Sequence, residues 1–250
     1  PDAILIAERG ADGEWVKVTY GQALARVYRI ATWLLGQNLS PERPVLVLSD
    51  NGVEHALLML ACLHAGVPIS PVSPGNSLLS KDYLKLKANV ELLRPGVIFA
   101  DTIERFMPAI NAIAGLHDGV VVAGSRSQPQ AGTKPFAEIE ATAADEVKVK
   151  AAFAALTPDT IAKFLFTSGS VGTPKAVITT QRTPASPAAA FSAPMSASCN
   201  APSKLLSACG RFSVRVSTAP SRRLSRGVAS SAMGTSGGDH DSSTDRSMNV

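Results

Sequence analysis

Cysteine and histidine are scarce in this chain of 250 residues. The three cysteines, Cys62, Cys199 and Cys209, form no Cys-x-x-Cys pair, which argues against a zinc site and against a disulfide scaffold. A reducing cytoplasm fits this cysteine usage best. The four histidines are scattered, and His55 and His64 are nine positions apart, about half a turn out of phase on one helix. We therefore predict no metal site for them.

Long apolar runs are also missing. No run approaches the ~20 residues that a membrane-spanning helix needs, so we expect no membrane association. The chain begins at Pro1 without a basic segment or a small-residue cleavage site, so nothing resembles a signal peptide. This beginning is typical of a fragment.

Aromatic residues make up 5% of the chain, and its net charge of +4 is unevenly placed. Residues 1–182 contain 17 basic and 17 acidic residues, whereas residues 183–250 contain 7 basic and 3 acidic ones. The excess is diffuse and has no interleaved aromatic residues that could stack on bases. We therefore expect no nucleic-acid partner.

Segments with helical and strand-like patterns alternate over the first 182 residues. Thr19 and Gln22 have the spacing of a capping box, and an apolar stripe follows them as far as Gly36. Asn51 with Glu54 predicts the start of a second helix, and Gly66 followed by Pro68 predicts its end. The further predicted helices span 80–93, 102–114 and part of 141–155, and the predicted strands span 44–49, 67–70, 97–100, 120–123, 161–166 and 175–180. This alternation predicts an α/β fold of βαβ units with a mainly parallel sheet.

Residues 183–250 differ in composition from the rest. They hold 16 Ser and 11 Ala but no Ile, Tyr, Trp or Glu, and they show no sustained periodicity. Such a segment has too little large apolar surface to offset the entropy of ordering, so we expect most of it to be disordered. The sequence thus predicts an N-terminal domain over 1–182 and a low-complexity tail over 183–250.

The motif with clear chemical meaning lies between the last two predicted strands. It consists of Thr167, Ser168, Gly169, Ser170, Val171, Gly172, Thr173, Pro174 and Lys175. Glycines and hydroxylated residues let backbone N–H groups and hydroxyls converge on phosphate oxygens, and a lysine adds a positive charge. A Gly/Ser-rich hairpin with a surface lysine is the plainer alternative. A Walker A loop fails, because Pro174 and Ala176 stand where it requires Gly and Ser or Thr.

This motif resembles the phosphate loop of the adenylate-forming superfamily, which includes acyl-CoA synthetases, luciferases and peptide-synthetase adenylation domains. The strings 162–166 and 180–182 around the loop, and 54–57, 65–68 and 71–74 earlier in the chain, resemble feruloyl-CoA synthetases. The resemblance covers 1–182 and implies an incomplete N-terminal AMP-binding domain. It implies an AMP-forming acid:CoA ligase that uses ATP, Mg²⁺ and coenzyme A and acts on a hydroxycinnamate such as ferulate. Two alternatives stay open. The chain could belong to another adenylate-forming ligase, for fatty or aryl acids, or it could be a non-catalytic nucleotide-binding fragment.

The resemblance also assigns roles within the loop. Thr167, Ser168, Gly169, Ser170, Gly172 and Thr173 would hold the β- and γ-phosphates, and Lys175 would stabilise the departing pyrophosphate. Val171 stands where the family has Thr, which removes one hydroxyl from this phosphate-binding set. No acid-binding residue and no metal ligand can be assigned.

The resemblance stops after Arg182, where the family continues with the acid pocket and a C-terminal domain that carries a further lysine. The composition of 183–250 is typical of GC-rich DNA read out of frame, so a frameshift or truncated gene near codon 183 is our hypothesis. We expect the chain alone to be inactive.

Overall fold

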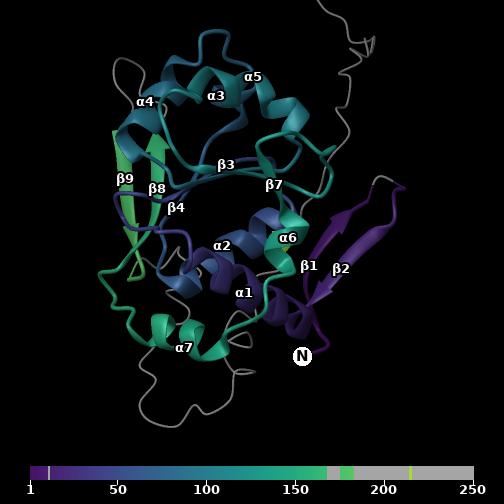
Figure 1. Ribbon diagram of the computed structural model, residues 1–250. Coiled ribbons are helices and arrows are strands. Elements are labelled where there is room, and N and C mark those ends of the chain that lie inside the picture. Colours follow the sequence, from purple (N-terminus) through teal and green to yellow (C-terminus); the bar gives the residue numbers. More distant parts are fainter. Residues whose placement is uncertain (11, 168–174, 183–213, 216–250) are drawn as a thin grey trace, which may run out of the picture. The chain divides into compact units, whose positions relative to one another are not determined.

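The computed structural model describes residues 1–10, 12–167, 175–182 and 214–215. Its centre is a seven-stranded sheet in the order β7-β6-β5-β3-β4-β8-β9, with helices on both faces (Figure 1). The strands are β1 (Ile4–Arg9), β2 (Trp15–Thr19), β3 (Val45–Leu48), β4 (Ile69–Pro71), β5 (Val97–Ala100), β6 (Val120–Ala123), β7 (Thr133–Pro135), β8 (Ile161–Thr167), β9 (Lys175–Thr180) and β10 (Val214–Arg215). The helices are α1 (Tyr20–Leu34), α2 (Val53–Ala65), α3 (Pro74–Ser77), α4 (Leu84–Leu93), α5 (Ile103–Ile113), α6 (Phe136–Glu140) and α7 (Glu146–Ala154).

Strands β3 to β8 of this sheet are mutually parallel, and only β9 runs antiparallel, alongside β8. The predicted α/β class with a mainly parallel sheet is therefore confirmed. The sequence also predicted β3, β5 and β6 within one or two residues, because each is a continuous apolar run. β3 and β5 are buried along their whole length between the two layers of helices.

Alternate residues of β3 enter two separate hydrophobic cores. Val45 and Val47 pack with α1, α2, α6 and α7, whereas Leu46 and Leu48 pack with α4 and α5. All four side chains are completely buried. This period-two alternation explains why the strand carries no polar residue.

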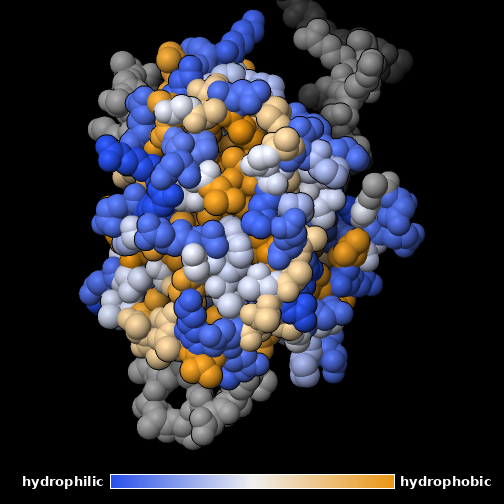
Figure 2. All heavy atoms as spheres, in the orientation of Figure 1, coloured by the Kyte–Doolittle hydropathy of each residue, from blue (hydrophilic) through white to orange (hydrophobic). Residues whose placement is uncertain are grey.

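Hydrophilic residues cover most of the face drawn in Figure 2, and hydrophobic residues reach the surface there in narrow strips. This distribution agrees with a fold whose apolar side chains lie between layers.

The N-terminus of α1 is as predicted. The Thr19 hydroxyl accepts a hydrogen bond from Gln22 N–H at 3.3 Å, and the Gln22 side chain accepts one from Thr19 N–H at 2.9 Å. The predicted end of α2 is also confirmed. Gly66, directly after this helix, adopts φ 71°, the left-handed conformation that glycine favours at a helix C-terminus.

The predicted start of α2 is wrong at its cap. Gly52, rather than Asn51, is the N-cap residue, and it makes no side-chain cap bond. Glu8 from β1 accepts the free N–H of Val53 at 2.7 Å, and Glu54 bonds elsewhere. A long-range carboxylate thus replaces the local cap that the sequence suggested.

Several elements were not predicted from the sequence. The hairpin of β1 and β2 and the pair β7 and α6 lie in stretches without clear periodicity, and α3 separates β4 from an α4 that starts later than predicted. Within the predicted tail the structure describes only β10, which pairs in parallel with β1. The other residues of 183–250 lie outside the described part, so their disorder stays a prediction. Among the described residues, no helix is long and apolar enough to cross a membrane.

Candidate functional site

The phosphate-loop motif connects two paired strands. β8 ends at Thr167, β9 begins at Lys175, and these two residues are cross-strand partners. The predicted strand, loop and strand are therefore confirmed at both flanks. Ser168, Gly169, Ser170, Val171, Gly172 and Thr173, with Pro174, lie outside the described residues, so the structure places the ends of the loop only.

The loop leaves the sheet at the carboxyl ends of its parallel strands. β8 runs parallel to β4, which runs parallel to β3, and β3 runs parallel to β5. Open α/β sheets bind their ligands at this edge. The motif therefore lies where the fold alone places a ligand site.

The opposite end of the hairpin is fixed to the domain. Gln181 N–H donates to Thr160 O at 2.9 Å, and Arg182 N–H donates to Pro158 O at 2.8 Å. The Arg182 guanidinium also forms an ion pair with Asp159 at 3.1 Å. The segment that follows β9 is thus held beside the segment that enters β8.

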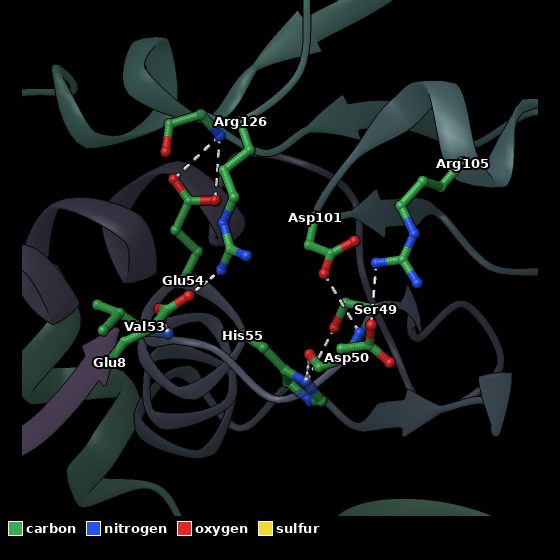
Figure 3. A network of polar contacts seen from close by, with 10 residues as sticks. Glu8, Ser49, Asp50, Val53, Glu54, His55, Asp101, Arg105 and Arg126 are labelled. Carbon is green, nitrogen blue, oxygen red and sulfur yellow. Dashed lines mark hydrogen bonds and ion pairs between the residues drawn. The ribbon is translucent and has the colours of Figure 1, made fainter. Parts of the chain in front are cut away.

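A network of polar side chains occupies the same edge of the sheet (Figure 3). Ser49 and Asp50 follow β3 directly, Asp101 follows β5, and Arg126 comes three residues after β6. Asp50 N–H donates to Asp101 Oδ2 at 3.3 Å, and the Arg105 guanidinium pairs with the Asp50 carboxylate at 2.9 Å.

The second half of the network surrounds the start of α2. Glu54 accepts the N–H of Ser125 at 3.1 Å through either carboxylate oxygen. Glu8 accepts the N–H of Val53 and also forms an ion pair with Arg126. These contacts join β1, α2 and the segment after β6 at the edge of the sheet (Figure 3).

The sheet changes its winding direction between β3 and β5. The chain leaves β3 through α2 toward β4 on one side, and leaves β5 through α5 toward β6 on the other. Such a switch point is the usual nucleotide crevice, with phosphates on free helix N–H groups. Here Glu8 takes the first N–H of α2, and the Ser127 hydroxyl accepts the first N–H of α5, from Ile103, at 2.9 Å. The protein's own side chains therefore use these donors.

Burial shifts the ionisation of several groups in this region. It raises the pKa of Glu54, against the lowering effect of the Ser125 hydrogen bonds, and it raises that of Asp101. Burial lowers the pKa of His55; the Asp50 carbonyl opposes this, and the positive charge of Lys163 on β8 adds to it. The positive charge of Lys163 on β8 thus affects the ionisation of His55 in the network.

Metal-binding side chains do not converge anywhere in the described part of the chain. No group of three or more His, Cys, Asp or Glu residues there could hold a metal ion. Two of the histidines have other contacts: His55 Nδ1 lies 3.0 Å from the Ser49 hydroxyl, and His64 stacks on an aromatic ring.

This network was not predicted from the sequence. The sequence did contain one signal, namely position: Ser49, Asp101 and Ser125 each follow an apolar strand within two residues. Glu8 gave no such signal, since its partners, Val53 and Arg126, are 45 and 118 positions away in the chain.

Comparison with known proteins agrees with this fold. The family model described as "AMP-binding enzyme" matches residues 1–209. A salicylyl-CoA synthase / salicylate adenylyltransferase of Streptomyces sp is 30% identical over 68% of this chain and 31% of its own length. A fatty acid–[acyl-carrier-protein] ligase, MmaC, of Mycobacterium marinum is 31% identical over 73% of this chain and 31% of its own.

Solved structures show the same fold. A red-emitting luciferase from Phrixothrix hirtus superposes with a TM-score of 0.54 at 17% identity, over 71% of this chain and 41% of the luciferase. ATP-bound MatB from Rhodopseudomonas palustris superposes with a TM-score of 0.52 at 23% identity, over 72% of this chain and 32% of MatB. This chain spans about a third or less of the length of these curated relatives. The extent of the family match shows that the chain belongs to the AMP-binding enzyme family.

Proposed function

We propose that this chain is the phosphate-binding N-terminal portion of an ATP-dependent ligase that activates a carboxylic acid as its acyl-adenylate. The observation that carries the proposal is the pairing of Thr167 with Lys175, which closes a Gly/Ser/Thr loop at the ligand-binding edge of a parallel sheet. Membership of the AMP-binding family supports it.

In this reaction an oxygen of the acid's carboxylate bonds to the α-phosphorus of ATP, and the bond to the β-phosphate oxygen breaks. Pyrophosphate leaves with the electron pair. Backbone N–H groups and hydroxyls of 167–173 would hold the β- and γ-phosphates, and Lys175 would offset the charge that develops on pyrophosphate. Because no group of three or more His, Cys, Asp or Glu residues in the described part could hold a metal ion, we assign Mg²⁺ no protein ligand.

For the acid, we propose a hydroxycinnamate such as ferulate, with coenzyme A as the acceptor of the acyl group. The basis is the similarity of segments such as 162–166 and 180–182 to feruloyl-CoA synthetases. The relatives widen the alternatives, since their names cover salicylate, fatty acids and proline, and both CoA and carrier-protein ligases. We propose the cytoplasm as its location, on the cysteine usage alone.

The first experiment measures binding of ATP and of pyrophosphate to this chain by calorimetry. We expect Lys175→Ala to weaken binding of both at least tenfold, because the lysine meets the phosphates they share. Lys134→Ala is the matched control: Lys134 is a partly exposed lysine of a different strand, β7, and it pairs with Glu138. Equal binding by the Lys175→Ala variant and the wild type would overturn the assignment of the loop.

The second experiment measures acid-dependent exchange of pyrophosphate into ATP, with hydroxycinnamic, benzoic, fatty and amino acids. It compares this chain with a longer form restored to the length of its relatives. We expect activity only in the longer form and strongest with hydroxycinnamates. Preference for another acid class would reject ferulate while keeping the ligase.

We further propose that 1–182 is the natural domain portion and that the reading frame departs near codon 183. The family match runs past that point to residue 209. Sequencing of the coding DNA across codon 183 is therefore the test of the frameshift. An intact frame through 183–250 would rule out the frameshift.

A further inference from the structure

β4 is an interior strand of the sheet, between β3 and β8, yet it ends in Pro71. Proline has no N–H group, so within a sheet it leaves one carbonyl on a neighbouring strand without its ladder donor. Proline is therefore largely confined to edge strands, and its place here needs a compensating contact.

Two backbone hydrogen bonds show which neighbour faces the missing N–H. Val45 N–H on β3 donates to Pro68 O at 3.0 Å, and Val72 N–H donates to Val47 O at 2.9 Å. Backbone groups of successive strand residues point to alternate sides. Positions 68 and 72 face β3, so Pro71 faces β8.

The carbonyl at that level of β8 belongs to Phe164. Ile69 pairs with Lys163, and in a parallel ladder the N–H two residues further along β4 would donate to the carbonyl one residue further along β8. The Ser70 hydroxyl donates to Phe164 O instead, at 3.0 Å, and Ser70 is completely buried. A side-chain donor thus replaces the backbone donor that Pro71 lacks.

This bond links the body of the sheet to β8 near the loop end of that strand, where Phe166 of β8 also packs against the core that contains Leu48. The ladder between β4 and β8 consists of the single pair Ile69 and Lys163, whereas beyond Phe164 β8 pairs only with β9. The hold on Phe164 is therefore one of the contacts that fix the end of β8, where Thr167 pairs with Lys175 at the start of the loop.

We propose that Ser70 is a positioning residue for the phosphate-binding loop, because its hydroxyl holds Phe164 O where Pro71 cannot. This inference rests on the proposed function of the loop. It predicts that loss of the hydroxyl loosens β8 and β9 locally and weakens phosphate binding, and that restoring an N–H at position 71 reverses both effects.

Hydrogen exchange tests the structural half of this proposal without any ligand. We expect Ser70→Ala to speed amide exchange in 161–167 and 175–180 about five- to tenfold, as loss of one buried hydrogen bond implies, with little change in β3 and β5. The double variant Ser70→Ala/Pro71→Ala should return the exchange rates to near wild type. Ser70→Cys, which keeps the volume and has a weaker donor, should be intermediate.

Ser77→Ala is the matched control. Ser77 is also a buried serine, 2% exposed, whose hydroxyl donates to a backbone carbonyl, that of Ser73, at 3.5 Å. It should leave the exchange rates of β8 and β9 unchanged. Uniform acceleration across all strands in Ser70→Ala, or no reversal by Pro71→Ala, would show that Ser70 is an ordinary core residue and overturn the proposal.

Calorimetry with ATP on the same variants tests the functional half. Binding should weaken about five- to tenfold in Ser70→Ala and recover in the double variant. If wild type binds no ATP, the proposed function fails, whatever the exchange rates show. If wild type binds ATP and Ser70→Ala loosens the hairpin but binds equally well, the function stands and the positioning role is rejected.

Discussion

His64 on α2 stacks on Phe153 on α7, with the ring centroids 4.5 Å apart and the planes at 24°. The ring of Tyr28 on α1 packs against the same imidazole, with the ring centroids 5.7 Å apart. Three helices therefore meet around His64. Burial lowers the pKa of His64 to about 4, because the charged form would lose its hydration there. This layer of helices is therefore joined through a neutral imidazole.

Acidic pH should lower the free energy of unfolding through protonation of His64. Its folded-state pKa lies below the ordinary value of 6.5, so the unfolded chain takes up the proton first. The stability that the neutral imidazole contributes is fully present above pH 6.5 and is lost as the pH falls toward about 4. This contribution to the free energy of unfolding is about 3 kcal/mol at most. Urea unfolding between pH 7.5 and 4.5 should show this loss in wild type and a smaller one in His64→Phe.

Glu54 and Asp101 act in the opposite direction, since their raised pKa values stabilise the fold below their ordinary ranges. Both remain in His64→Phe, so the difference between the two proteins isolates the histidine. Parallel pH profiles for wild type and His64→Phe would contradict the assignment.

Glu8 should stabilise the domain more than its partner Arg126. Glu8→Gln removes the negative charge that meets both the Val53 N–H and the guanidinium, from a side chain that is 16% exposed. We expect a loss of about 1–3 kcal/mol in urea unfolding. Arg126→Gln should lose less than about 1 kcal/mol, since the arginine side chain is 57% exposed. Glu14→Gln, on the exposed strand-turn segment of the same hairpin, is the control. Equal losses of unfolding free energy in all three variants would contradict the role of Glu8 as the N-terminal cap of α2.

Val171 should limit the reaction of the complete ligase. Val171→Thr restores the hydroxyl of the family motif, and a gained hydrogen bond to phosphate is worth about 0.5–3 kcal/mol. In the longer form we expect faster exchange of pyrophosphate into ATP, by a factor between about 2 and about 160. Val177→Thr, at an exposed valine of β9, is the matched control. Unchanged exchange in Val171→Thr would show that this hydroxyl has no role.

Local signals in the sequence predicted the elements that local forces determine. The capping box of Thr19 and Gln22, the glycine stop at Gly66 and the apolar run of β3 depend on neighbouring residues or on burial of both sheet faces. The hairpin of β1 and β2 depends instead on long-range partners, which periodicity does not report.

The candidate site was predictable to a similar extent. The residues from Thr167 to Lys175 form one continuous motif, so the sequence alone indicated both flanking strands. The roles of Ser70 and Glu8 depend on strand register and on contacts 94 and 45 positions apart in the chain. Only the fold brings those residues to their partners.

Gly124 should be indispensable at the end of β6. A Cβ at this position would lie 2.4 Å from Asp101 O and 2.7 Å from Glu54 Oε2, so backbone of the switch point would have to move. We expect Gly124→Ala to lower the free energy of unfolding by about 1–3 kcal/mol. It should also speed amide exchange around Ser125, whose N–H bonds to Glu54.

Gly115→Ala is the control for that substitution, because a Cβ there meets nothing within 4 Å. It should change stability by no more than about 0.5 kcal/mol. If Gly124→Ala were as stable as Gly115→Ala, the close approach of β6 to the carboxylate network would not be a constraint. A loss confined to Gly124→Ala would instead show that the network depends on a backbone contact that only glycine permits.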